Sequence, residues 1–251
     1  MNDRGAHGAS DSEPAFYVRG RGAGRDLLAV LHPPYTAWHL SFVVIGAAAA
    51  PVVSWRLLGL TVAAFFLAVG VAAHALDELH GRPLGTELGV VTLKMLAVGT
   101  LAVAVGIGVA EAIMVGLWLL VLVAVGAFLV VGYNLEMFGG RLHTDWAFAV
   151  SWGGFPALVG YVVQSRSVTP SALAIAGGAT GISIAQRALS TQARLLRRRV
   201  TAVTGFLVLD GKRRDLDRLF LLRPVEVALS ALSWSITILA LGLVGARLGH
   251  Y

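Results

Sequence analysis

The chain has 251 residues, of which 57% are hydrophobic and 14% are charged, whereas soluble domains average about 25% charged residues. This composition predicts an integral membrane protein, and the absence of cysteine excludes disulfides, thiolate catalysis and cysteine metal sites. The net charge of +6 does not indicate nucleic-acid binding, because most arginines lie between apolar segments, where they report membrane orientation.

A series of apolar segments follows a polar N-terminal arm over residues 1–34. We expect no signal peptide, because no apolar core directly follows the first arginines. The segments are long enough to cross about 30 Å of hydrocarbon, which needs roughly 20 residues each, and their many small residues favour close helix packing in lipid. The prediction is an all-α fold, a polytopic transmembrane helix bundle over residues 35–251. We expect about seven spans, at residues 36–54, 57–76, 89–110, 112–133, 146–164, 169–187 and 225–247.

Charged residues between the expected spans predict the orientation. Most of the 20 Lys and Arg residues fall on one side, which the positive-inside rule assigns to the cytoplasm. With seven spans, the N-terminus lies inside and the C-terminus outside, and we expect the cytoplasmic membrane as the location. The acids follow the same side, with Glu111 alone in an outer loop. We therefore expect chemistry at the cytoplasmic face.

The second span ends in a polar cluster within "HALDELHGRP". On a helix, His74, Asp77 and Glu78 share one face, and Pro83 ends the helix soon after. Such carboxylates can hold Mg²⁺, which binds through one or two carboxylates plus substrate phosphates, and a neighbouring histidine also permits a transition metal. The alternative interpretation is a solvated helix end in which Arg82 pairs with an acid.

A second polar segment is the 134–145 loop, "NLEMFGGRLHTD". It offers Glu136, Arg141, His143 and Asp145 as polar side chains. Tyr133, at the membrane boundary, also has the ordinary interpretation of an interface anchor. The turn "FGGR" could let backbone approach a phosphate, although a lone pair of glycines is a weak signal.

The third segment is the arginine-rich 188–224 connection. Its first part, "QRALSTQARLLRRR", has the helical rhythm of an interfacial helix on an anionic leaflet. The alternative is that Arg194, Arg197 and Arg198 bind phosphate through charge-assisted contacts. The following "TAVTGFLVL" is too short to cross a membrane alone, and "DGKRRDLDR" reads as a turn followed by mixed charges.

Two stretches together resemble the UbiA superfamily of intramembrane prenyltransferases over roughly residues 35–190. They are "HALDELHGRPLGT" and, two spans later, "YNLEMFGGRLHTDWAFAVSWGGFPALVGYVV". Asp77 matches the middle Asp of the family's N-D-x-x-D-x-x-x-D motif, and residues 82–84 match its R-P-L. The chain departs from the family at His74 and Gly81, where acids are expected, and again at residues 186–190, where a second acidic motif is missing.

The resemblance implies a bundle of up to nine helices that binds an isoprenoid diphosphate with Mg²⁺ at the cytoplasmic face and transfers the prenyl group. Implied catalytic residues are Asp77 and Glu78. Candidate metal ligands are His74, Asp77, Glu136 and Asp145. Candidate substrate-binding residues are Arg82, Tyr133, Arg141, Arg194, Arg197 and Arg198.

Two other functions stay open at this point. The first is a non-catalytic relative, a lipid-binding or structural membrane protein that kept the bundle and lost the metal-diphosphate chemistry. The second is a metal-dependent membrane enzyme using His74, His80 and His143, whose spacing matches no ligand signature. Convergence of Asp77, Glu78 and Glu136 on one cavity would favour catalysis, whereas acids that splay into water would favour the non-catalytic relative.

Overall fold

The computed structural model describes residues 22–83 and 85–249, so most of the expected arm, and Leu84 of the R-P-L match, lie outside the described residues. The helices are α1 (Ala23–Leu31), α2 (Pro33–Ala49), α3 (Trp55–Phe65), the π-helix η1 (Phe66–Ala73), α4 (His74–Leu79), α5 (Val90–Val115), α6 (Leu119–Asn134), α7 (Asp145–Ala149), the π-helix η2 (Val150–Gly154), α8 (Phe155–Ser165), α9 (Pro170–Arg198) and α10 (Arg218–Leu248). The strands are β1 (Phe206–Leu209) and β2 (Lys212–Asp215), which form one hairpin. Within the described residues the all-α prediction is therefore confirmed, with this hairpin as the exception.

Several helices have the length and composition of membrane spans. Within the described residues they are five: Gly24–Ala49, Trp55–Leu79, Val90–Val115, Asp145–Ser165 and Arg218–Leu248. Helix α6 is apolar but shorter, and α9 is long but is not among the five. Each of the seven expected spans overlaps a helix, although the span expected at 112–133 begins inside α5. Length and composition support an integral membrane protein with five candidate spans within the described residues, so the count of about seven is not confirmed.

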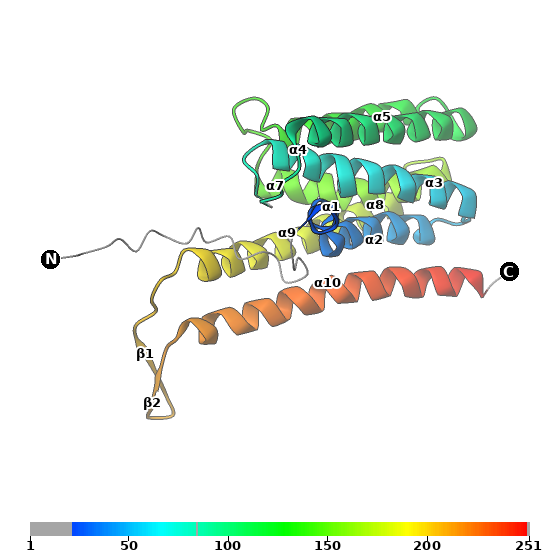
Figure 1. Cartoon of the computed structure of the whole chain (residues 1–251). Helices are drawn as coiled ribbons and strands as arrows, with labels where there is room; N and C mark the ends of the chain where they lie inside the picture. Colours follow the sequence, from blue (N-terminus) through cyan, green and yellow to red (C-terminus); the bar gives the residue numbers. More distant parts are fainter. Residues whose placement is uncertain (1–21, 84, 250–251) are drawn as a thin grey trace.

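The long helices pack side by side as a bundle, and the hairpin lies at one end of it (Figure 1). We call this the hairpin end; α2 and α7 begin there, and α4, α6 and α9 finish there. Residues 23–34, expected within the polar arm, form α1 and the start of α2. The two helices are separated by His32, whose positive φ of 41° turns the chain, so helical structure begins before the expected arm ends.

Polar side chains start four of the helices. The caps are Ser54, Thr144, Thr169 and Asp217, whose side-chain oxygens accept from backbone N–H groups of the first turn in α3, α7, α9 and α10. A helix leaves its first N–H groups without partners, and hydrocarbon offers none, so local capping suits a membrane bundle.

Two helices contain a π-helical stretch. η1 links α3 to α4, and η2 links α7 to α8, so each pair runs as one continuous rod. A π-helical turn inserts an extra residue into the helix and recurs at functional sites. Both stretches lie towards the hairpin end of the bundle, next to the polar residues described below.

Helices α2 and α8 cross at very short range. A Cβ atom built on Gly46 would lie 2.0 Å from the Ala157 carbonyl oxygen, and one built on Gly160 would lie 2.1 Å from the Val43 carbonyl oxygen. Both neighbours are backbone atoms, which cannot move aside as a flexible side chain could. Glycine at both positions therefore allows the two backbones to touch, as in other tightly packed membrane helices.

We expect Gly160→Ala to lower the free energy of unfolding by about 1–3 kcal/mol, the usual cost of overpacking. The matched control is Gly99→Ala in α5, where an added Cβ meets nothing within 4 Å and alanine should be neutral or stabilising. Thermal unfolding of both variants in the same detergent measures the difference. Equal midpoints for the two variants would contradict the close crossing.

Candidate functional site

The hairpin end gathers aromatic side chains from α6, from the loop that follows it and from the α7–η2–α8 rod. Tyr133, at the end of α6, is buried, and its ring stacks on His143 with centroids 4.5 Å apart. It also meets the edge of Trp152 at 5.7 Å and packs against Phe148 at 6.2 Å. Tyr133 therefore lies inside an aromatic cluster that joins α6, α7 and η2.

Asp77 lies beside this cluster in α4. Its carboxyl interacts electrostatically with Tyr133 and with the acids Glu136 and Glu78. Glu136 in turn lies 4.0 Å from both His80 Nε2 and His143 Nδ1. The structure thus brings Asp77 and Glu136 into one region from separate parts of the chain. Glu136 is exposed, and none of Asp77, Glu78 and Glu136 lines the apolar cavity described below, so the three acids do not converge on one cavity.

Arg187 brings a cation from α9 to the same region. Its Nε donates to Asp145 Oδ1 at 2.8 Å, and its guanidinium carbon lies 4.9 Å from the centroid of the Phe148 ring. The cation also interacts electrostatically with Tyr133 and Tyr35. Sequence reasoning did not select Arg187 as a site residue.

Helix α9 turns a polar face towards the bundle interior. Ser183, Gln186 and Ser190 are buried, and their spacing of three and four residues puts them on one side of the helix. The resemblance expects its second acidic motif at 186 and 190, so these positions face inward but carry an amide and a hydroxyl. Within the described residues, Ser183 Oγ and Gln186 Oε1 are buried without a hydrogen-bond partner. The place of Arg187 on this helix, between those two motif positions, was the available signal for it.

Glu78 and Arg82 hold the loop that follows α4. Glu78 is completely buried, and its Oε1 accepts from the N–H and the hydroxyl of Thr86 at 2.7 and 2.8 Å. Arg82 donates to the carbonyls of Thr86 and Leu88 at 2.8 and 3.1 Å. Both side chains therefore have a structural role in this loop, and Arg82 contacts carbonyls where the alternative interpretation expected an acid.

The remaining predicted arginines, Arg141, Arg194, Arg197 and Arg198, are exposed. Arg194 donates to Thr191 Oγ1 at 3.3 Å and interacts electrostatically with Tyr133, so it lies within reach of the cluster. Arg197 pairs with Glu226 of α10 and thereby ties α9 to α10.

Three histidines pack next to the cluster. His39 Nδ1 lies 2.7 Å from the Trp152 carbonyl, and His74 Nδ1 lies 3.2 Å from the Gly70 carbonyl. A carbonyl oxygen only accepts, so Nδ1 carries the proton in both rings. Trp152 and Gly70 belong to η2 and η1, and the ring of His32 stacks on that of His74 at 5.3 Å. His32 and His39 were not predicted, because one fell in the expected arm and the other in an apolar span.

The predicted metal ligands have separate surroundings. Asp145 pairs with Arg187, while His74 faces a backbone carbonyl. Among the residues that the structure describes, no three His, Cys, Asp or Glu side chains are grouped closely enough to hold a metal ion. Asp77 and Glu136 remain as two carboxylates that interact electrostatically, and one or two carboxylates are the protein ligands that a Mg²⁺ site commonly uses.

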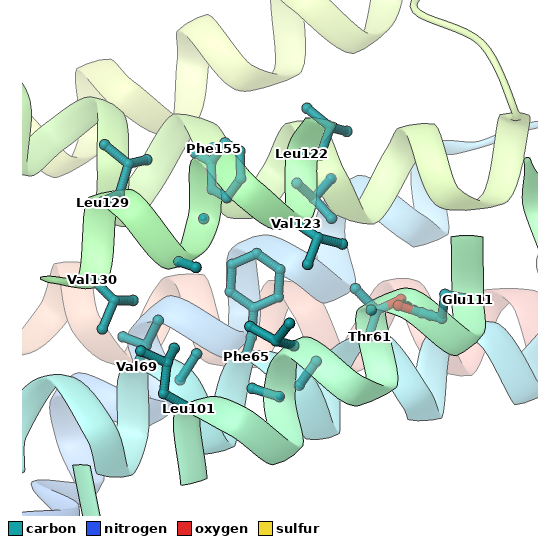
Figure 2. A pocket seen from close by; sticks show the side chains of 18 of the residues that line it. Thr61, Phe65, Val69, Leu101, Glu111, Leu122, Val123, Leu129, Val130 and Phe155 are labelled. Carbon is teal, nitrogen blue, oxygen red and sulfur yellow. Dashed lines mark hydrogen bonds between the residues drawn. The ribbon is translucent and has the colours of Figure 1, made fainter. Parts of the chain in front are cut away.

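An apolar cavity runs inside the bundle between α3–η1, α5, α6 and η2–α8 (Figure 2). The cavity itself has a volume of about 80 Å³, and the wider space between these helices, open solvent included, amounts to about 670 Å³. Val69, Leu101, Val130 and Trp152 line it near the hairpin end. Trp152 also contacts the ring of Tyr133. The apolar cavity therefore ends against the group formed by Tyr133, Asp77 and Arg187, which we call the polar cluster.

Glu111 corrects the sequence analysis. We expected it in an outer loop, but it lies within α5, is only 3% exposed and lines the far end of the cavity. Its Oε1 accepts from Thr61 Oγ1 at 2.7 Å, and the two side chains point towards each other in Figure 2. The expectation failed because α5 extends to Val115, five residues beyond the expected end at residue 110.

Comparisons with protein-family models, curated proteins and solved structures found no match for this chain.

We expect Thr61→Val to lower the free energy of unfolding by about 1 kcal/mol, because it leaves the buried Glu111 carboxyl without its hydroxyl donor. The double variant Thr61→Val/Glu111→Met should recover most of that loss, since both polar partners are then gone. Thermal unfolding in detergent measures both effects.

The matched control for this pair is Thr100→Val in α5. The Thr100 hydroxyl donates to the Leu96 carbonyl of its own helix at 2.6 Å, so its removal leaves no buried carboxyl unpaired and should cost less. A double variant less stable than Thr61→Val alone would contradict the interaction between Thr61 and Glu111.

Proposed function

We propose that the protein is a membrane prenyltransferase of the UbiA type that binds an isoprenoid diphosphate at the hairpin end of its bundle. One observation carries the proposal: the apolar cavity ends at Trp152, directly against a cluster that contains Tyr133, Arg187 and Asp77. This arrangement suits a molecule with a long apolar chain, which would lie in the cavity, and a charged head, which would lie at the cluster.

The apolar chain would lie in the cavity. Its walls are almost entirely hydrocarbon and aromatic side chains from four helical rods, and the cavity extends about 15 Å along α5 from Leu101 to Glu111, at 1.5 Å per helical residue. Burial of apolar surface drives such binding. The Thr61–Glu111 pair would mark the far limit for the chain, since hydrocarbon against a buried carboxyl is unfavourable.

The diphosphate would lie at the polar cluster. Arg187 would bind one phosphate through charge-assisted hydrogen bonds, and the exposed Arg194 would approach from the same helix. Tyr133 would donate its hydroxyl, and Gln186 would turn its amide towards the head group. Asp145 holds the guanidinium of Arg187 in place, so we assign it a positioning role.

Mg²⁺ would be held by Asp77 and Glu136 together with phosphate oxygens. A bound Mg²⁺ neutralises charge that builds up on a departing diphosphate. The protein's own part is to hold the two carboxylates beside Arg187 and to shield the prenyl chain from water with Trp152, Tyr133 and Phe148.

The orientation is part of the same proposal. In it, the hairpin end faces the cytoplasm, the protein lies in the cytoplasmic membrane, and α6 and α9 cross the membrane in addition to the five candidate spans. The N-terminus is then inside and the C-terminus outside. The positive-inside rule supports this orientation, because Arg187, Arg194, the 197–199 arginines and the hairpin cations lie at one end.

A non-catalytic relative that binds the same lipid is the second candidate function. It is favoured by the amide and hydroxyl at residues 186 and 190, where the resemblance expects carboxylates, and by the pairing of Asp145 with Arg187. The partners implied for both functions are membrane lipids and an isoprenoid diphosphate.

Isothermal titration with geranylgeranyl diphosphate, with and without Mg²⁺, tests the proposal. We expect Arg187→Gln to weaken binding about tenfold or more in both conditions, because a charge-assisted hydrogen bond is lost. We expect Asp77→Asn to abolish the strengthening of binding by Mg²⁺ while leaving metal-free binding unchanged. The controls are Arg56→Gln, a cation at the opposite end of the bundle, and Asp210→Asn in the hairpin turn; both should bind like the unmodified protein.

Release of inorganic diphosphate during incubation with the same lipid separates the two candidate functions. Release that depends on Asp77 supports the transferase, and tight binding without release supports the non-catalytic relative. Binding no stronger than that of geranylgeraniol, which lacks the diphosphate, would contradict both.

A further inference from the structure

The connection between α9 and α10 contains a fully exposed β-hairpin. β1 and β2 pair antiparallel, from Phe206 opposite Asp215 to Leu209 opposite Lys212. Asp210 and Gly211 form the turn, and both have positive φ, as a two-residue hairpin turn of type I′ requires. All eight strand residues are exposed, among them four consecutive apolar residues, which is unusual for a hairpin surrounded by water.

The two faces of the hairpin differ in charge. Residues directly opposite each other in an antiparallel pair share a face. The first face carries Phe206, Val208, Arg213 and Asp215. The second face carries Leu207, Leu209, Lys212 and Arg214.

Only the second face has an uncompensated positive charge. On the first face, Arg213 donates to Asp215 at 3.0 Å and lies over the Phe206 ring, 4.2 Å from its centroid. The second face combines two leucines with two cations and no acid. Arg214 lies over the ring of Phe220 at the start of α10, 4.7 Å from its centroid, which connects this face to the bundle.

The hairpin lies past the ends of α9 and α10 and extends across the direction of the helix axes, on the α10 side of the bundle (Figure 1). If the helices cross a membrane, this direction runs along the membrane surface. The last turn of α9 adds Arg197 and Arg198, and α10 begins with Arg218. Further cations therefore flank the hairpin along the chain on both sides, and Arg197 among them pairs with Glu226.

We propose that the hairpin docks on the anionic surface of the membrane that holds the bundle, with its leucine-and-cation face towards the lipid. Leu207 and Leu209 insert at the boundary between head groups and acyl chains, and Lys212 and Arg214 contact lipid phosphates. Apolar burial and attraction to anionic lipid act together in such interfacial binding. We assign an anionic leaflet as the partner because this face has cations and no acid.

Site-directed spin labelling tests the proposal directly, because the chain contains no cysteine. A nitroxide is attached at Leu209→Cys, on the proposed lipid face, and at Val208→Cys, the matched position on the opposite face. The protein is placed in nanodiscs of phosphatidylcholine alone or mixed with phosphatidylglycerol. Collision with oxygen, which concentrates in lipid, is compared with collision with a water-soluble nickel chelate.

In anionic nanodiscs we expect the ratio of oxygen to nickel accessibility to be higher at residue 209 than at residue 208. That excess should shrink in pure phosphatidylcholine and be lost when Lys212→Gln and Arg214→Gln are combined. Arg213→Gln, which removes a cation from the other face, should preserve it.

Equal water accessibility of both labels in anionic nanodiscs would overturn the proposal. So would a label at 209 that is immobilised and shielded from both reagents, because that pattern indicates contact with protein, such as a second copy of the chain. Loss of the excess in Arg213→Gln would show that net charge alone, and not the assigned face, controls the position of the hairpin. These readouts do not depend on isoprenoid binding.

Discussion

The close crossing of α2 and α8 is the constraint on which the arrangement of the hairpin end depends. Gly46 and Gly160 let the two backbones touch, so the α7–η2–α8 rod is fixed against α2 without intervening side chains. That contact brings His39 to the carbonyl of Trp152. Trp152 is then held between the apolar cavity and the ring of Tyr133, so the close backbone contacts at Gly46 and Gly160 determine where the cavity meets the polar cluster.

The polar groups inside the bundle are arranged so that most of them have a hydrogen-bond partner. Within hydrocarbon a polar group without a partner is costly. The backbone carbonyls of Gly70 and Trp152, both in π-helical stretches, therefore accept hydrogen bonds from histidines, and the Glu78 carboxylate accepts from Thr86. These interactions are structural. Ser183 Oγ and Gln186 Oε1, buried without partners in the described chain, stand out against them, and they lie on the helix that also supplies Arg187.

The sequence was sufficient for the class of fold and for the approximate helix segments, because apolar length is a strong signal. Asp77, Tyr133 and Glu136 were also predicted as site residues, and the structure brings them into one region. Glu78 and Glu111 show what the sequence could not supply. The Glu78 carboxylate accepts hydrogen bonds from Thr86, eight residues away in the following loop. Glu111 lies inside α5, whose end the hydropathy pattern placed too early. The π-helical stretches leave no periodic signal over five to eight residues, so the contacts of His39 and His74 could not be anticipated.

The composition of α9 bears on which of the two candidate functions is the better one. Two carboxylates on this face would need cations before a diphosphate could approach, which is how metal ions become obligatory in such a site. Here the face carries an amide, hydroxyls and the cations Arg187 and Arg194, so its charge already favours an anion. Metal would then be recruited only on the α4 side, by Asp77 and Glu136. In the proposed transferase the site would therefore be asymmetric: α9 would bind the diphosphate directly, and any assistance to its departure would come from Asp77 on α4.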